Sequence, residues 1–217
     1  TANQDIAEEA AQVFNRLCMA QVMEETHHLL VAPKCLQNKV LDFIEEEICH
    51  ADNNEPAYIG VKMNSLTDKT IIDKMVEASQ HGVKIDLVVR GICCLIPGIE
   101  GYTENIRVIS IVGRYLEHSR IYIFGTPERD KMFISSADFM TRNMVKRVEV
   151  ATPIYDTAIK DRVRTMFGIM LHDTVKGREL CRDGNYYRRE KPQEESEVIS
   201  SQAYFSNEAY LAASKNV

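Results

Sequence analysis

The sequence predicts an α/β fold in which helices cover both faces of a mixed sheet. Two runs rich in Val and Ile, at residues 58–63 and 84–89, flank an amphipathic segment at 67–81. This spacing is typical of a βαβ unit, whose two strands are parallel. Two further apolar runs, at 121–124 and 132–134, are separated by a turn and predict a hairpin. Because a hairpin adds antiparallel strands, the predicted sheet is mixed.

The chain is long enough to bury one sizeable core. It has 217 residues, of which 45% are hydrophobic, and we expect one main domain of about 150 residues with polar ends. No apolar run reaches the roughly 18 residues that predict a transmembrane helix. The N-terminal residues lack the basic and apolar blocks of a signal peptide, and they lack an initiator methionine. These features indicate a piece of a longer protein.

The first third of the chain predicts two helices. Apolar residues recur at three- and four-residue steps over 6–25, and again over 36–50. Between them lies a short apolar run at 29–31, which Pro33 stops, and a polar loop follows at 51–56.

The middle of the chain predicts three strands and one helix. Thr67 or Asp68 caps the helix, and Gly82 ends it. A long loop at 91–103 contains a Pro-Gly pair. The strands are the apolar runs at 58–63, 84–89 and 106–111.

The last third begins with the hairpin and continues with a strand at 148–153 and a helix at 157–171. The chain becomes polar after Gly177. Residues 190–217 are rich in Glu, Ser and Asn, and they predict a tail with at most one weak helix near 207–214.

Charge is distributed unevenly along the chain. The net charge is -6, yet residues 84–147 carry ten basic against seven acidic side chains, whereas residues 1–56 carry three against eleven. The overall acidity argues against general nucleic-acid binding, and the local basic excess permits a polyanion site. Six cysteines without a C-x-x-C pair indicate reduced thiols in a cytosolic protein. A zinc site is not expected, because the adjacent His27 and His28 would diverge on a helix.

The strongest candidates for chemistry surround the hairpin. His118 and Arg120 stand two residues apart at the entrance of a strand, so both point to the same side of the sheet. The partner strand ends in Ser135, Ser136 and Asp138. A titratable ring, a guanidinium and hydroxyl groups in a small volume suit phosphoryl transfer. A lone histidine is more often structural, however, and Arg120 could instead hold Asp138.

Further candidates stand at strand ends. Arg90 follows one strand of the βαβ unit and Arg147 precedes a later strand, where arginine can clamp phosphate, although either could form a solvent-exposed salt bridge. Lys62 and Asn64 flank the end of the first parallel strand and are candidate phosphate ligands. No Walker A or G-x-G-x-x-G motif occurs, so a P-loop kinase or a Rossmann dehydrogenase is unsupported.

Five segments together carry a family resemblance. They are Val61-Lys62-Met63-Asn64-Ser65-Leu66, residues 82–95, residues 104–114, Leu116-Glu117-His118-Ser119-Arg120-Ile121-Tyr122 and Ile134-Ser135-Ser136-Ala137-Asp138. They closely resemble the C-terminal region of bacterial polyphosphate kinases of the class 1 family. The resemblance covers residues 28–189, which look like the second of two phospholipase D-like C-terminal domains. Residues 1–27 look like the helical tail of a preceding domain.

The resemblance implies one half of an ATP:polyphosphate phosphotransferase site. The family transfers the terminal phosphate of ATP to polyphosphate, reversibly and with Mg²⁺, through a phosphohistidine on the upstream domain. His118 matches the family's second active-site histidine, Arg90 matches an arginine that binds the ATP phosphates, and Arg147 would line the same phosphate tunnel. The implied partners are ATP or ADP, polyphosphate, the upstream domains and further copies of the enzyme, without nucleic acid. The implied location is the cytoplasm, with peripheral attachment to the inner membrane as an alternative.

The chain departs from the phospholipase D pattern H-x-K-x-x-x-x-D. Arg120 replaces the lysine and Gly125 replaces the aspartate, while Ser135, Ser136 and Asp138 stand in place of G-S-x-N. No evident carboxylate would orient His118, which argues against an independent phosphodiesterase nucleophile. Two rival functions stay open, namely a phospholipase D-type phosphodiesterase or nuclease half, and a non-catalytic module that binds polyanions.

Overall fold

The centre of the fold is a mixed sheet. The computed structural model describes residues 2–190, 192–194 and 198–214. Within them, nine strands form one sheet in the order β1-β7-β6-β5-β2-β3-β4-β8-β9. The strands are β1 (Leu30–Ala32), β2 (Tyr58–Met63), β3 (Lys84–Val89), β4 (Ile106–Ile111), β5 (Ile121–Phe124), β6 (Lys131–Ser135), β7 (Glu149–Pro153), β8 (Gly177–Leu180) and β9 (Tyr186–Arg188).

Only the three central strands run parallel. β2 pairs in parallel with β3, and β3 pairs in parallel with β4. The pairs on either side, β2 with β5 and β4 with β8, are antiparallel. The predicted mixed sheet is therefore confirmed, as is the hairpin, in which Ile121 lies opposite Ile134.

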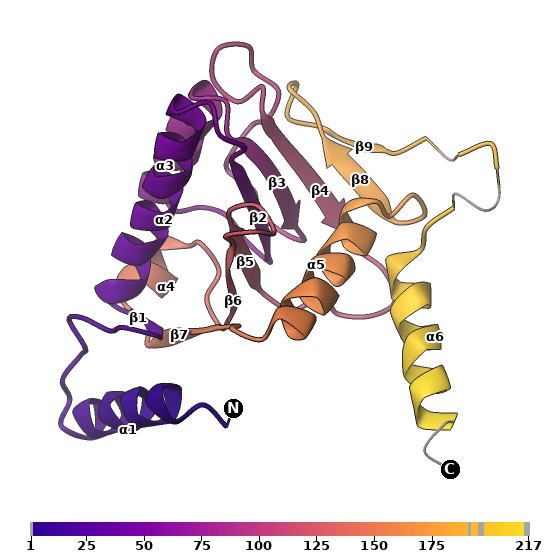
Figure 1. The fold of residues 1–217 in the computed structure, drawn as a ribbon. Coiled ribbons are helices and arrows are strands. Elements are labelled where there is room, and N and C mark those ends of the chain that lie inside the picture. The colour runs from indigo at the N-terminus through magenta and orange to yellow at the C-terminus, as the bar shows by residue number, and fades with distance from the viewer. Residues whose placement is uncertain (1, 191, 195–197, 215–217) are drawn as a thin grey trace.

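Helices cover both faces of this sheet (Figure 1). On one face, α2 (Cys35–Asp52) and α3 (Lys69–Gln80) share a core with the sheet, in which Leu36, Ile44 and Met75 are completely buried. On the other face, α5 (Thr157–Leu171) contributes Phe167 and Met170 to a second core. α6 (Ser201–Ser214) adds the partly buried Phe205 to that second core. α1 (Gln4–Cys18) and the short α4 (Thr141–Val145) complete the fold.

The predicted first helix is too long. α1 ends at Cys18 rather than near Glu25, because Ala20 adopts a left-handed conformation with φ 54. The carboxylate of Glu9 in α1 then accepts hydrogen bonds from the backbone N–H groups of residues 27, 28 and 29, at 2.5, 3.0 and 2.6 Å. These contacts fold the following segment back along α1 before β1 begins.

The prediction for the C-terminal part is also wrong in several places. β8, β9 and α4 were not expected, and the supposed weak helix near 207–214 is the longer α6. Residues 191, 195–197 and 215–217 of the predicted tail lie outside the described residues. By contrast, the bounds of β2, β3, β4 and α5 agree with the sequence prediction, and the side chain of Asp68 caps α3.

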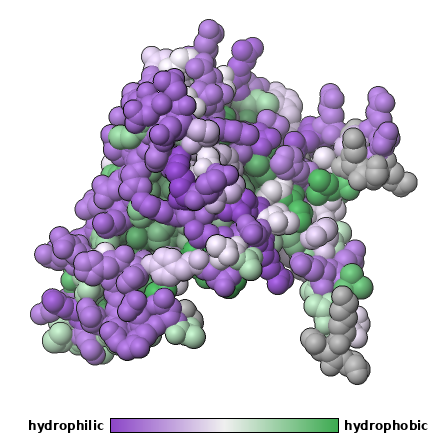
Figure 2. Space-filling model, viewed as in Figure 1, coloured by the Kyte–Doolittle hydropathy of each residue, from purple (hydrophilic) through white to green (hydrophobic). Residues whose placement is uncertain are grey.

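Hydrophilic side chains cover most of the face shown in Figure 2, and hydrophobic ones show along α6. Tyr210 and Leu211 of α6 are largely exposed. All six cysteines are free thiols. In the described part of the chain, no helix has both the length and the apolar character needed to cross a membrane.

Candidate active site at the strand ends

A polar cleft of about 670 Å³ opens at one end of the sheet. β2 and β3 end there, β5 begins there, β6 ends beside it and β7 begins beside it, so each strand delivers residues to one place. The lining residues are Asn64, Ser65, Arg90, His118, Arg120, Ser136, Asp138, Met140, Arg142, Asn143, Arg147 and Glu149. The cleft thus brings together seven of the nine residues that the sequence singled out, and it includes both His118 and the two strand-end arginines.

Asn64 connects the ends of β2, β3 and β6. Its backbone N–H donates to Asp138 Oδ1 at 2.7 Å, and its Oδ1 accepts from Arg90 Nε at 2.9 Å. One N–H group of Arg90 therefore donates to a neutral amide and not to a carboxylate. No carboxylate pairs with Arg90 among the described residues. Its charge is left available to an anion in the cleft.

Arg120 forms the structural pair with Asp138 that the sequence left open. Its Nε donates to Oδ1 and its Nη2 to Oδ2, both at 3.1 Å, which is a bidentate arrangement. Burial raises the pKa of Asp138, but hydrogen bonds from Arg120 and Asn64 outweigh this effect and hold that pKa below its ordinary value. Asp138 is therefore a carboxylate at neutral pH, and it keeps Arg120 fixed beneath His118.

The ring of His118 contacts the same arginine. Arg120 Nη1 lies 3.1 Å from His118 Nδ1 and donates to the His118 carbonyl oxygen at 2.9 Å. A guanidinium has only donors, so Nδ1 must accept and the ring hydrogen must lie on Nε2 in this arrangement. Nε2–H is then the group that His118 can offer to a molecule in the cleft. Hydrogen bonds run from His118 through Arg120, Asp138 and Asn64 to Arg90.

The opposite wall of the cleft holds further arginines. Arg147 is mostly exposed and its Nε lies 3.5 Å from Glu149 Oε1. Glu149 also accepts hydrogen bonds from Ser136 and Asn143, so its charge is shared. Arg142 has no side-chain partner among the described residues. Four arginines against two carboxylates leave the cleft with an excess of positive charge.

Lys62 does not line the cleft, contrary to the sequence prediction. Its side chain is 1% exposed, and Nζ donates to the carbonyl oxygens of Glu117 at 3.2 Å and Ser119 at 2.9 Å. Burial lowers the pKa of Lys62 to about 8, although the nearby Glu117 offsets part of this effect. Lys62 is buried and binds the backbone on either side of His118, so its side chain supports that segment and is not among the residues that line the cleft.

Ser135 also lies outside the cleft lining. Its Oγ accepts from the backbone N–H of Ala137 at 3.0 Å and donates to the Val150 carbonyl, so it shapes the turn after β6. Ser136, its neighbour, reaches the cleft wall and contacts Glu149.

Sequence reasoning missed several residues that line the cleft or bind the segment before His118. Arg142 and Asn143 lie in α4, which is too short to give a periodic signal. Glu149 is the first residue of β7. Arg147 is a candidate because it stands just before this strand, so the same attention to strand ends could have identified Glu149. Gln202 of α6, which binds the segment before His118, was hidden in the supposed tail.

The described residues do not build a metal cage. No group of three or more His, Cys, Asp or Glu side chains among them could hold a metal ion. The two carboxylates of the cleft, Asp138 and Glu149, already accept hydrogen bonds from Arg120, Asn64, Ser136 and Asn143. A hard cation would therefore need oxygen ligands from a bound phosphate and water.

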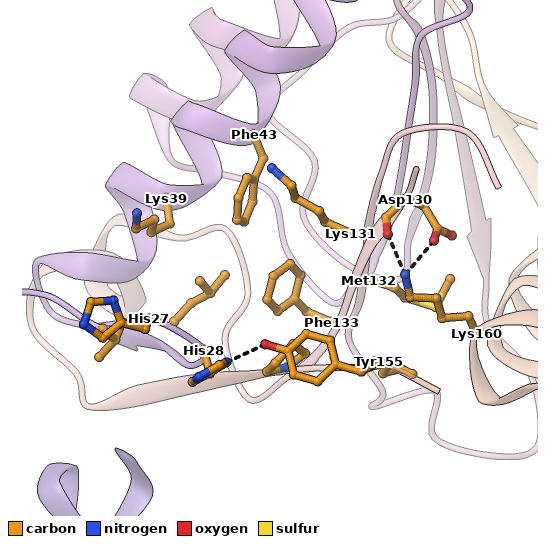
Figure 3. Close-up of a pocket in the computed structure, with 14 residues that line it drawn as sticks. His27, His28, Lys39, Phe43, Asp130, Lys131, Met132, Phe133, Tyr155 and Lys160 are labelled. Carbon is orange, nitrogen blue, oxygen red and sulfur yellow. Dashed lines mark hydrogen bonds and ion pairs between the residues drawn. The ribbon is translucent and has the colours of Figure 1, made fainter. Parts of the chain in front are cut away.

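A second pocket, of about 360 Å³, lies at the other end of β6 and β7 (Figure 3). Several of its polar groups are already paired. His28 Nδ1 contacts the Tyr155 hydroxyl at 2.7 Å, and Lys160 Nζ contacts Asp130 Oδ1 at 2.9 Å. Lys131 pairs with Glu46 and lies over the ring of Phe43. Lys131 and Lys160 are thus each paired with a carboxylate, whereas Arg90 in the strand-end cleft is not.

The fold and the cleft define a phospholipase D-like α/β domain with a basic site at its strand ends. The structure of Nuc from Salmonella typhimurium, a phospholipase D family member, superposes on 70% of the chain and 96% of that structure with a TM-score of 0.51, at 15% identity. The likeness to Nuc concerns the fold alone.

The family follows from closer matches. The model for polyphosphate kinase C-terminal domain 2 matches residues 29–202, and the chain belongs to this family. It is 50% identical to a polyphosphate kinase of Bacillus cereus over 187 residues, which are 86% of this chain and 27% of that protein. It is 47% identical to one of Staphylococcus epidermidis, over 96% of this chain and 28% of that protein.

A solved structure agrees. The crystal structure of polyphosphate kinase from Porphyromonas gingivalis superposes on 100% of this chain with a TM-score of 0.89 and 34% identity. The chain covers 33% of that structure. It thus spans about a third or less of the length of these relatives.

Proposed function

We propose that this chain supplies the phosphate-binding half of an ATP:polyphosphate phosphotransferase site. The observation that carries the proposal is the meeting of Arg90, Arg142, Arg147 and His118 in one cleft, where Arg90 and Arg142 have no acidic partner among the described residues. Unpaired guanidinium groups bind phosphoryl oxygens in bidentate fashion. A chain of phosphates, with several negative charges in a row, matches a cleft with several separate arginines.

In this proposal His118 assists the transfer and does not attack. Its Nε2–H would donate to an oxygen that gains negative charge as the phosphoryl group moves, and the arginines would neutralise the remaining oxygens. The attacking histidine would come from an upstream domain, as in the family that the sequence resembles. The chain's own contribution is then to bind, orient and stabilise charge.

A phosphodiesterase activity is disfavoured by the contacts of His118. A histidine nucleophile needs an acceptor at its second ring nitrogen, which holds the ring and stabilises the imidazolium. Here that nitrogen faces the donor group of Arg120. Arg120 itself is tied to Asp138, so it is not free to hold a phosphodiester as the lysine of the phospholipase D pattern would.

Other components are proposed on the family membership. Mg²⁺ would arrive with the phosphates of ATP, since the described residues offer no ligand cluster of their own. ATP or ADP, polyphosphate, the upstream domains and further copies of the enzyme are the proposed partners. The free cysteines fit a reducing compartment such as the cytoplasm.

Substitution of Arg90 tests the proposal. With tripolyphosphate as the probe, we expect Arg90→Ala to weaken binding to this chain by about tenfold, which corresponds to about 1.4 kcal/mol. In the whole enzyme, Arg90→Ala and His118→Ala should each lower polyphosphate synthesis by about 10²–10³. Arg178→Ala, which removes an exposed arginine of β8 outside the cleft, is the matched control. Wild-type synthesis by either cleft variant would overturn the proposal.

A further inference from the structure

α6 is held to the body of the domain by its first turn. Among its described residues only Ser201 and Gln202 are buried, at 0% and 7% exposure, and both are polar. A buried polar side chain destabilises a protein unless hydrogen bonds satisfy it. The partners of these two residues therefore show what the start of α6 is built to hold.

Ser201 anchors α6 to the segment that follows α5. Its backbone N–H and its hydroxyl donate to Asp173 Oδ2 at 2.8 and 2.6 Å. Oδ1 of the fully buried Asp173 accepts from three further backbone N–H groups, those of residues 175, 176 and 177. Burial raises the pKa of Asp173, but these hydrogen bonds outweigh it and hold that pKa below its ordinary value. The position of the first turn is thus well determined.

Gln202 extends from this fixed turn to the segment that carries His118. Its Nε2 donates to the Tyr115 carbonyl oxygen at 2.8 Å and to Glu117 Oε1 at 2.9 Å. Its Oε1 accepts from the Tyr115 backbone N–H at 3.1 Å. One side chain therefore fixes the backbone at residue 115 in both directions and the side chain two residues further on.

The lack of a side chain at Gly113 leaves room for the contact between Gln202 and Tyr115. A Cβ atom at Gly113 would lie 2.3 Å from Gln202 Oε1, so any larger residue would displace the glutamine. The segment itself has little else to hold it, because Val112 and Leu116 are 68% and 69% exposed. Its second support is Lys62, which binds the carbonyl oxygens on either side of His118.

We propose that Gln202 is a positioning residue for His118, and that α6 is the element through which its anchor on the buried Asp173 sets the orientation of that ring. Gln202 holds residues 115 and 117, Lys62 holds residues 117 and 119, and His118 projects between these supports towards the cleft. The role of these contacts in phosphoryl transfer rests on the proposed function, whereas their effect on the position of His118 does not.

The hydrogen position on His118 gives a direct readout. In two-bond ¹H–¹⁵N spectra of this chain, the ring should show the Nε2–H tautomer that the Arg120 contact imposes. In Gln202→Leu and in Gly113→Ala we expect His118 to lose this pattern and average between tautomers, while the other five histidines keep theirs. Gln80→Leu is the matched control, because Gln80 also donates to a backbone carbonyl, that of Gly101, but far from His118.

Gln202→Leu removes the side-chain amide, and Gly113→Ala displaces it, so both variants break the same contact. If one variant does not fold, the other still tests the contact. An unchanged His118 pattern in either folded variant would overturn the proposal, and so would unfolding of both, because the contact would then serve stability alone. Tripolyphosphate binding separates this test from the proposed function. If Arg90→Ala binds the probe as wild type does, the proposed function fails, whatever His118 shows in the Gln202 variant.

Discussion

The two ring nitrogens of His118 face different surroundings. Nδ1 accepts from Arg120, which Asp138 holds in place, so the nitrogen that remains for chemistry is Nε2. In a catalytic triad the second nitrogen would donate to a carboxylate and the ring could gain a full positive charge. The arrangement here suits hydrogen-bond donation to a phosphate better than covalent attack on one.

Lys62 gives the domain a distinctive dependence of stability on pH. Its pKa is about 8 in the folded chain and has an ordinary value of 10.5. Between these values the unfolded chain holds a proton that the folded chain has lost, so the free energy of unfolding rises with pH. We expect wild type to gain up to roughly 3 kcal/mol relative to Lys62→Met across this window, at about 1.4 kcal/mol per pKa unit.

Urea unfolding of both proteins at several pH values between pH 8 and pH 10.5 measures this gain. Lys69→Met is the control, because the Lys69 side chain is 86% exposed and pairs only with Asp73 on the helix surface. If the free energies of unfolding of wild type and Lys62→Met differ by the same amount from pH 8 to pH 10.5, burial does not lower the pKa of Lys62 and the prediction is wrong.

The strand-end rule accounts for the part of the cleft that could be predicted. Arg90 and Asn64 were candidates because ligand sites gather where parallel strands end, and His118 was a candidate because it shares a strand entrance with Arg120; the structure brings all of them together. The rule misplaced Lys62, because it does not say whether a side chain just inside a strand end faces the ligand or the core. It missed Gln202, since a contact between residues 85 or more positions apart leaves no local pattern.

At the scale of elements, α1 depends on one carboxylate. Burial raises the pKa of Glu9, but three backbone N–H groups of residues 27–29 outweigh this effect and lower it. We expect Glu9→Ala to free α1 from β1 and to speed amide hydrogen exchange at residues 27–29 by about tenfold or more, while the central strands stay protected. Each lost hydrogen bond to a charged group is worth about 1.5–3 kcal/mol.

Hydrogen exchange followed by mass spectrometry checks this expectation. Glu8→Ala is the matched control, since Glu8 is exposed and accepts only from Gln4 within the same helix. Equal exchange at residues 27–29 in the two variants would show that the apolar contacts of Ile6 and Val13 alone hold α1 in place.

Elements with a strong local period were predictable, and elements defined by distant partners were not. β2, β3, β4 and α5 each have a clear apolar pattern and the expected bounds. β8 and β9 are short and polar, with Arg178 opposite Arg188, and they become strands only because β8 adds to the edge of β4. α6 has little amphipathic pattern, because its polar first turn, not an apolar stripe, fixes it to the domain.

At the scale of the whole molecule, this chain supplies only one half of the proposed active site. The chain covers about a third or less of its relatives, and the cleft contains one histidine among its lining residues. We expect the 217 residues to bind tripolyphosphate but to form no polyphosphate from ATP and Mg²⁺. Gel electrophoresis of the reaction products checks this, with a full-length polyphosphate kinase as the positive control. Chain growth by these residues alone would contradict the division of labour between domains.

β9, one of the two edge strands of the sheet, has a consequence for handling this chain in solution. A free strand edge invites a neighbouring copy to dock through its unused amides and can seed fibrils. β9 is only three residues long, and the exposed Arg188 lies opposite Arg178 on β8. If the β9 edges of two copies of the chain met, these arginines would come close together, and their positive charges would repel one another. That mutual repulsion should help concentrated solutions of the domain to remain clear.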